Sequence, residues 1–149
     1  MERDTGTSNR NSALAFDYGE RRIGVAFANR TTETATALTT LQARDGHPVP
    51  QELQSLIDEW QPDALVVGVP YNLDGSDSPM TSRAMDFGKA LGEKHGLPVE
   101  TVDERLTSEE ASMMLREQRR TGARRRKVHR EDIDSLAARL IAETWLRNQ

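Results

Sequence analysis

The 149-residue sequence contains no cysteine, which excludes disulfide bonds, thiolate nucleophiles and thiolate metal sites. Aromatic residues make up only 5% of the chain, too few for the stacking platforms that bind single-stranded nucleic acid. The sequence also lacks an apolar run of about 18 residues, and its polar N-terminus lacks the apolar region of a signal peptide. We therefore expect a cytoplasmic protein that does not cross a membrane.

The charges of the chain are unevenly distributed. The formal net charge is −4, from 20 Lys and Arg residues and 24 Asp and Glu residues. Residues 116–130, the basic segment, hold eight basic residues and a single acid, which gives this window a charge of +7. The other 134 residues carry a charge of −11. The basic segment is either a solvated loop or a local site that binds phosphate groups. Its positive charge, in a chain that is otherwise acidic, favours the phosphate-binding site.

Within the basic segment, the candidate phosphate contacts are Arg119, Arg120, Arg124, Arg125, Arg126 and Lys127.

Apolar periodicity predicts a single domain over residues 12–149, preceded by a disordered polar tail over residues 1–11. Three strands come first, over residues 12–17, 22–28 and 34–41. Helices and strands then alternate, with a helix over 50–60, a strand over 64–69, a helix from 79, a strand over 97–102, and helices from 107 and over 131–147. This order predicts an α/β fold in which a mixed five-stranded sheet, a three-strand meander followed by alternating elements, carries helices on both faces.

Acidic residues lie at the carboxyl ends of two predicted strands, where ligands of open α/β sheets gather. Asp17 ends the first strand, and Asp103 and Glu104 follow the strand over 97–102. Each acid has a structural alternative, because aspartate often begins a turn and acids ahead of a helix stabilise its N-terminus.

A further acid, Asp134, lies on the last predicted helix, at the flank of its apolar stripe. The residues three, four and seven positions later are Ala137, Ala138 and Ile141. Small residues let a helix approach a sheet closely, which would bring the carboxylate of Asp134 near a strand end. The alternative is a first-turn acid that stabilises the helix dipole.

Two or three carboxylates on adjacent elements can hold one or two divalent ions such as Mg²⁺ or Mn²⁺, about 4 Å apart when two are bound. Such a centre hydrolyses phosphodiester bonds without a cysteine, serine or histidine nucleophile. Combined with the basic segment, it indicates a nuclease that acts on nucleic acid.

Four motifs resemble those of the YqgF/RuvX family: DYGERRIGVA (17–26), VVGVPYNLDG (66–75), DERLTSEEA (103–111) and DIDSLAARLI (132–141). The family comprises small bacterial proteins related to RuvC-type Holliday junction resolvases. The resemblance implies an RNase H-like fold and a hydrolase acting on ester bonds. Its implied role is processing of the 5′ end of precursor 16S rRNA in ribosome biogenesis, with resolvase-like cleavage of branched DNA as the alternative.

The resemblance also implies roles for particular residues. The metal-binding and catalytic carboxylates would be Asp17, Glu104 and Asp134, with Asp103 as the alternative to Glu104. Arg22 and Arg105 match arginines of the family motifs and would contact phosphate. In the resolvases an acid follows the strand that corresponds to residues 64–69. This sequence has VGVP there, and its second acid comes from the next strand.

Two other classes of function compete with a nuclease. The first is a non-catalytic nucleic-acid-binding factor in transcription or ribosome assembly. The second is an actin-like nucleotide-binding unit, which the length of the chain disfavours. The sequence leaves open whether the substrate is RNA or DNA and whether the protein is a monomer or a homodimer.

Overall fold

The computed structural model of the protein describes residues 10–104 and 130–148, with the side chains of residues 130–134 outside the description. In this part a mixed sheet of six strands has the order β4-β3-β2-β1-β5-β6. The strands are β1 (Ser12–Asp17), β2 (Arg22–Asn29), β3 (Thr34–Arg44), β4 (His47–Pro48), β5 (Ala64–Val69) and β6 (Val99–Asp103). The helices are α1 (Pro50–Trp60), α2 (Pro79–His95) and α4 (Arg130–Arg147).

The predicted meander and the predicted parallel strands are both present. β1, β2 and β3 pair antiparallel in sequence order, β5 pairs parallel with β1, and β6 pairs parallel with β5. Consecutive apolar residues in β5 are buried on both sides, as expected for a strand in the middle of a covered sheet. The carboxyl ends of β1, β5 and β6 therefore meet at one edge of the sheet.

A sixth strand, β4, was not predicted from the sequence. It has only two residues and pairs antiparallel with the end of β3. The connection between them is the dipeptide Asp45-Gly46, with φ of 51° and 80°. An Asp-Gly pair with two positive φ angles is typical of a two-residue β-hairpin turn, so this dipeptide was the available signal. Two residues are too few for apolar alternation to reveal the strand itself.

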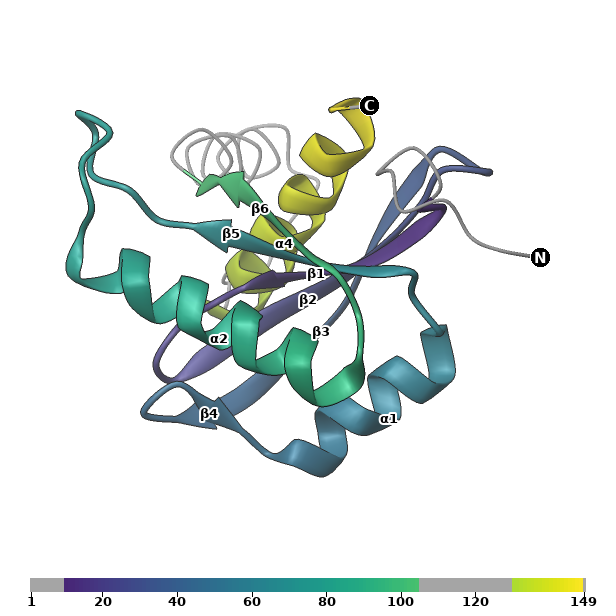
Figure 1. Ribbon diagram of the computed structural model, residues 1–149, viewed down its shortest axis with the longest axis horizontal. Helices are drawn as coiled ribbons and strands as arrows, with labels where there is room; N and C mark the ends of the chain where they lie inside the picture. Colours follow the sequence, from purple (N-terminus) through teal and green to yellow (C-terminus); the bar gives the residue numbers. More distant parts are fainter. Residues whose placement is uncertain (1–9, 105–129, 149) are drawn as a thin grey trace, which may run out of the picture.

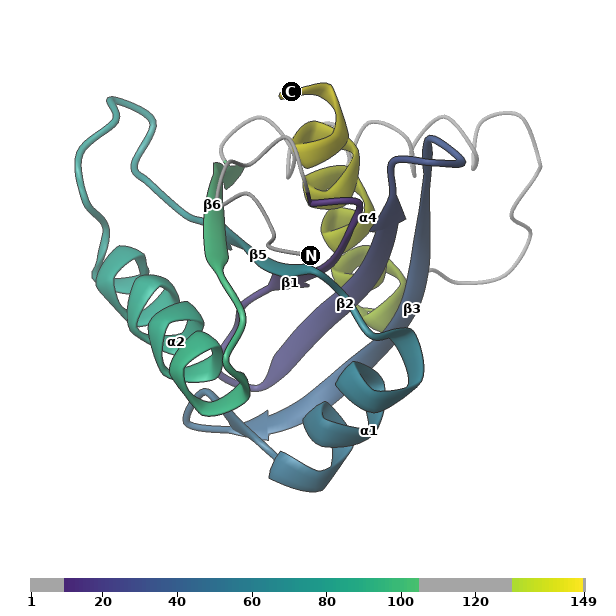
Figure 2. The same cartoon turned by 45° about the vertical axis from the view of Figure 1, so that its right-hand side comes forward.

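Helices cover both faces of the sheet (Figures 1 and 2). On one face α4 packs on small residues, including Ala13 and Ala15 of β1, through Ile141 and Trp145. On the other face α1 and α2 pack on larger side chains of the sheet such as Phe16. Successive side chains of each strand point to opposite faces of the sheet. Within a strand, every second residue therefore faces α4, and the residues between them face α1 and α2.

Helix α4 runs antiparallel to β1. Its C-terminal end lies at the start of β1, because the guanidinium carbon of Arg30 is 3.7 Å from the ring centroid of Trp145 and the Arg30 N–H donates to the carbonyl of Asn11 at 2.8 Å. The N-terminal end of α4 therefore lies toward the carboxyl end of β1. This direction brings the first turns of α4 to the edge where the acidic strand ends meet.

Some sequence expectations fall outside the described residues. These are the helix from residue 107, the basic segment apart from the backbone of Arg130, and all of the predicted tail except Arg10 and Asn11. None of the described helices is long and apolar enough to span a membrane.

Candidate active site

Asp17 is the last residue of β1 and lies on the face that α4 covers. It continues the alternation of Ala13 and Ala15, which both pack in the core beneath α4. Its backbone pairs with Gly24 of β2, and the residue is half-buried. Asp17 therefore sits at the carboxyl edge of the sheet with its backbone held in the ladder and its carboxylate on the α4 side.

Glu104 follows β6 directly and lies on the same face. Only 6% of Glu104 is exposed. A Cβ atom placed on Gly68 of β5 would lie 3.3 Å from Cδ of Glu104. The carboxyl group of Glu104 thus extends from β6 over the backbone of β5, in the direction of β1.

Asp17, Gly68 and the carboxyl group of Glu104 form a row, although the backbone of Gly68 pairs with Val102 and Glu104 lies two positions further along the chain. Phe16 pairs with Val67, so Asp17 and Gly68 occupy the next positions along the parallel strands β1 and β5. Gly68 in turn is covered by the carboxyl group of Glu104. The structure therefore brings two of the predicted carboxylates to one face at one edge of the sheet.

Asp103 lies on the opposite face. It alternates with Val99, which packs among the residues beneath α1 and α2, and Asp103 is exposed. The two neighbouring acids differ in environment because β6 continues through Asp103, one residue further than the sequence predicted. The strand therefore turns Asp103 away from α4, while Glu104, the residue after the strand, places its carboxyl group at Gly68 on the α4 side.

Asp134 belongs to the first turns of α4. It precedes Ala138 by four residues and Ile141 by seven, and both of these pack on the sheet. Its backbone position therefore continues the stripe that faces the sheet, about 10 Å along the helix from Ile141 toward the edge that carries Asp17. The side chain of Asp134 lies outside the described residues, so its role remains a prediction.

Arg22 begins β2 on the same face as Asp17. It alternates with Gly24, the partner of Asp17, and with Ala26, which packs beneath α4. This places Arg22 diagonally across the strand pair from Asp17, a relation in which Cα atoms are about 7–8 Å apart. The other predicted phosphate contacts, Arg105 and the six residues of the basic segment, lie outside the described residues.

Gly68, one residue before the end of β5, leaves room for the carboxyl group of Glu104. An alanine there would clash with Cδ1 of Ile141 and crowd the carboxyl carbon of Glu104. The glycine leaves the space that a carboxylate from the residue after the neighbouring strand occupies. The role of this glycine is not visible in the sequence, because its neighbours come from α4 and from the residue after β6.

We expect Gly68→Ala to lower cleavage at least tenfold, because the added methyl group pushes the carboxyl group of Glu104 out of its place. It should also cost about 1–3 kcal/mol of unfolding free energy through overpacking against Ile141. Gly88→Ala is the matched control, since it overpacks the other face against Val67 and Val99. Rates per folded molecule and urea unfolding separate the two effects, and equal rate losses in both variants would contradict the role given to Gly68.

Among the described side chains, no group of three or more His, Cys, Asp and Glu residues is arranged to hold a metal ion. The described part of the site thus offers two carboxylates, Asp17 and Glu104. Carboxylate oxygens are the ligands that Mg²⁺ and Mn²⁺ prefer, and both acids lie on the α4 face at the carboxyl edge of the sheet. The described residues fit one half of a divalent-ion site, which Asp134 would complete.

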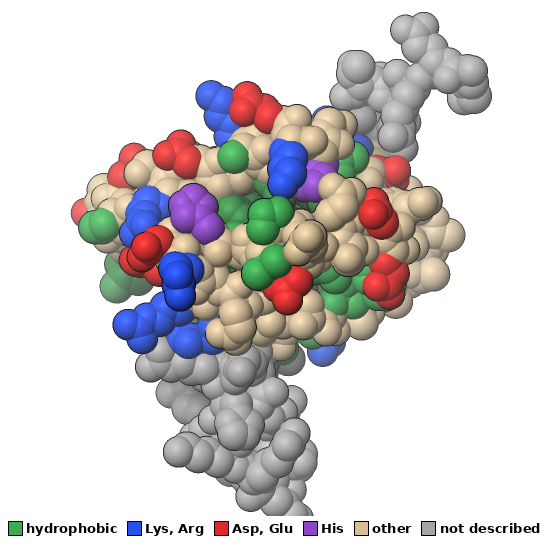
Figure 3. All heavy atoms as spheres, turned by 90° about the horizontal axis from the view of Figure 1, so that it is seen from below, with side chains coloured by type: hydrophobic (Ala, Val, Ile, Leu, Met, Phe, Trp, Pro, Cys, Tyr) green, Lys and Arg blue, Asp and Glu red, His purple; other side chains and the backbone are tan. Residues whose placement is uncertain are grey.

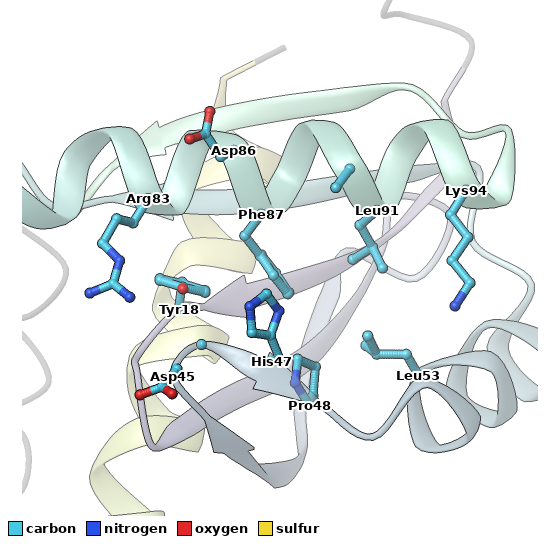
Figure 4. A pocket seen from close by; sticks show the side chains of 12 residues that line it. Tyr18, Asp45, His47, Pro48, Leu53, Arg83, Asp86, Phe87, Leu91 and Lys94 are labelled. Atoms are coloured by element: carbon cyan, nitrogen blue, oxygen red, sulfur yellow. The ribbon is translucent and has the colours of Figure 1, made fainter.

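A separate hollow of about 450 Å³ lies on the opposite face, between α2, α1 and β4. Figure 4 shows Phe87 and Leu91 of α2 facing Tyr18 and His47 across it. Basic and acidic side chains are interspersed on this surface of the molecule (Figure 3). The hollow has an apolar floor and a rim of both charges, so it lacks the uniform basic character of a phosphate-binding groove.

Comparison with solved structures identifies the class of fold to which the protein belongs. The structure resembles RuvC from Thermus thermophilus in complex with a Holliday junction substrate at 14% sequence identity, with a TM-score of 0.53 over 88% of this chain and 91% of RuvC. A second structure of Thermus thermophilus RuvC gives a TM-score of 0.52 over 87% of this chain and 92% of that one. The fold is therefore RNase H-like, as predicted.

The family follows from the sequence. Residues 11–148 match the model of the family described as "RuvX: Holliday junction resolvase", and the protein belongs to this family. A relative from Chromohalobacter salexigens is 47% identical over 89% of this chain and 86% of its own length. One from Coxiella burnetii is 44% identical over 92% and 93% of the two chains. Both carry the name "Putative pre-16S rRNA nuclease", so the resemblance predicted from the four motifs is confirmed.

Proposed function

We propose that this RuvX-family nuclease depends on divalent ions and cuts structured nucleic acid, with the 5′ end of precursor 16S rRNA in the cytoplasm as its substrate. Membership of the family makes it a nuclease, a hydrolase of phosphodiester bonds. The observation that carries the proposal is the row of Asp17, Gly68 and Glu104, which sets two carboxylates on one face at the carboxyl edge of the sheet.

The residues that would hold the ions are Asp17, Glu104 and Asp134. When bound, Mg²⁺ or Mn²⁺ lowers the pKa of a water and stabilises the leaving oxygen of the cleaved bond. Asp17 supplies carboxylate oxygens from the end of β1 and Glu104 from the residue after β6, on either side of β5, and burial fixes the Glu104 carboxylate in one position over Gly68. Arg22, on the same face, would orient a phosphate of the substrate.

RNA as the substrate is inferred from the relatives, whose names denote a nuclease of precursor 16S rRNA. The basic segment would contact several phosphates and so position the RNA, while the acidic remainder of the chain limits binding elsewhere. Cleavage of a four-way junction is the second candidate, favoured by the description of the matching family and by the RuvC fold.

The test is an assay of the purified protein on precursor 16S rRNA and on a four-way DNA junction, with Mg²⁺, with Mn²⁺ and with EDTA. We expect metal-dependent cleavage near the 5′ end of the RNA and none in EDTA. Cleavage of the junction alone would favour the resolvase, and binding with no cleavage of either substrate, even with Mg²⁺ or Mn²⁺, would favour a non-catalytic factor. The molecular mass in solution completes the test, because symmetric cutting of two strands needs a homodimer.

Neutralising Arg124, Arg125 and Arg126 to glutamine should weaken RNA binding and flatten its salt dependence. If each arginine contacts one phosphate, the slope of log K against log[salt] falls by about 2–3, because fewer counterions are released. The matched control removes the same charge elsewhere, at Arg44, Arg83 and Arg139. An unchanged slope in the first variant, or an equal change in the control, would remove the basic segment from the RNA surface.

A further inference from the structure

The loop between β5 and α2, residues Pro70–Asp77, projects from the body of the protein as an arm (Figures 1 and 2). Tyr71 and Asp77 form an antiparallel bridge at its base. At its tip the N–H of Gly75 donates to the carbonyl of Asn72 at 2.8 Å, which closes a four-residue turn over Leu73 and Asp74. The arm is thus a short hairpin with a defined apex.

Hydrogen bonds within the arm hold the tip in one shape. The side-chain amide of Asn72 donates to Oγ of Ser76 and to the carbonyl of Asp77, both at 3.1 Å. The N–H of Ser76 and its hydroxyl donate to Oδ1 of Asp74 at 2.9 and 2.6 Å. Gly75, with φ of 89°, supplies the left-handed backbone that lets the turn close.

The base of the arm is fastened to helix α2. Ser78 precedes the helix as its N-cap, and Pro79 begins it at the predicted residue. The hydroxyls of Ser78 and Thr81 both donate to the carbonyl of Pro70 at 2.7 Å. The arm is therefore anchored at both ends and cannot swing freely from the sheet.

The apex of this polar arm carries one large apolar side chain, that of Leu73. Leu73 is 93% exposed, whereas the next most exposed large apolar residues in the described part, Val49 and Met85, reach 46% and 40%. Single exposed leucines are common on protein surfaces, so exposure alone decides nothing. Leu73 differs from an ordinary exposed leucine because a hydrogen-bonded turn, anchored at its base, holds it at the tip of the arm. This arrangement suggests that Leu73 contacts a partner.

The arm begins next to the candidate active site. Leu73 follows Gly68 by five residues, so it can lie at most about 17 Å from the position over which Glu104 extends. Successive base pairs in a DNA duplex are about 3.4 Å apart. A nucleic acid whose phosphate reaches Asp17 and Glu104 would therefore meet the tip within about five nucleotides of the cut.

We propose that Leu73 is a wedge that inserts between bases of the bound nucleic acid where the duplex ends, and so sets the strand and the position of the cut. The inference rests on the proposed nuclease function. Apolar side chains of this size unstack base steps in other complexes. Asp74 and Asp77 flank the tip with negative charge, which disfavours contact with phosphates and leaves the base faces as the complementary surface.

The experiment uses an RNA hairpin with a single-stranded 5′ extension and 2-aminopurine at the end of the duplex, bound in EDTA to prevent cleavage. Wild type should raise the 2-aminopurine fluorescence on binding, which reports unstacking. Leu73→Ala should bind about tenfold more weakly, equivalent to about 1.4 kcal/mol, and raise the fluorescence less than half as much. Leu73→Met, which keeps the apolar bulk, should match wild type, and so should Val49→Ala, which truncates an exposed side chain elsewhere.

The remaining outcomes separate this inference from the proposed function. If Leu73→Ala binds, unstacks and cuts at the same position as wild type, the wedge is wrong and the nuclease function stands. If wild type neither binds nor cuts any nucleic acid, both are wrong. If Leu73→Ala changes the molecular mass in solution instead, the tip is a contact between protein chains and the wedge is overturned.

Discussion

Replacing Asp17 by asparagine is expected to lower cleavage of RNA by at least about a thousandfold while the protein stays folded. The amide has nearly the shape of the carboxylate but no charge. It therefore cannot neutralise the charge of a divalent ion, and it competes poorly with water as a ligand of that ion. The backbone of Asp17 pairs with Gly24 and is unaffected by the change. Single-turnover cleavage rates with Mg²⁺ or Mn²⁺ measure the first effect, and urea unfolding measures the second.

Glu20→Gln provides the matched control for Asp17→Asn. Glu20 is an exposed acid three residues away, in the turn that follows β1, and its carboxylate is 3.1 Å from the guanidinium of Arg83. A surface ion pair of this kind contributes about 0–1 kcal/mol, so removing it should change neither stability nor cleavage appreciably. Turnover at the wild-type rate in Asp17→Asn would remove this carboxylate from the site, and loss of folding would assign it a structural role instead.

Much of the fold could be predicted because its elements leave local signatures. The apolar run of β5 and the Ser78-Pro79 start of α2 are examples, and both are confirmed. β4 was missed because its only signal was a turn dipeptide, Asp45-Gly46. Local sequence therefore identifies the layers of this protein well and its short edge strand poorly.

The candidate site was less predictable, because it depends on contacts between distant segments. Asp17 could be singled out from its position at a strand end. The choice between Asp103 and Glu104 could not be made, because the sequence does not show which residue ends the strand, and only residues within the strand keep its alternation of faces. The part played by Gly68 was equally hidden, since its neighbours Glu104 and Ile141 are 36 and 73 positions away in the sequence.

The two neighbouring acids should respond very differently to the same change. Glu104→Gln is expected to lower cleavage at least about a hundredfold, because Glu104 lies buried on the face of Asp17 and its carboxyl group extends over Gly68. Asp103→Asn should stay within about twofold of wild type, because Asp103 is exposed on the opposite face. Cleavage rates of the two variants at saturating Mg²⁺, with stability measured in parallel, make the comparison.

Each of these two variants is the control for the other. Both substitutions remove one negative charge at neighbouring residues, so they change the long-range electrostatic field of the protein almost equally. A difference between them must therefore come from the face on which each side chain lies. Loss of cleavage in Asp103→Asn with wild-type rates in Glu104→Gln would reverse the assignment and make Asp103 the ligand. Equal losses of cleavage rate in both variants would mean that the total charge at the end of β6 matters and not one particular carboxylate. The position of Glu104 over Gly68 would then play no part in catalysis.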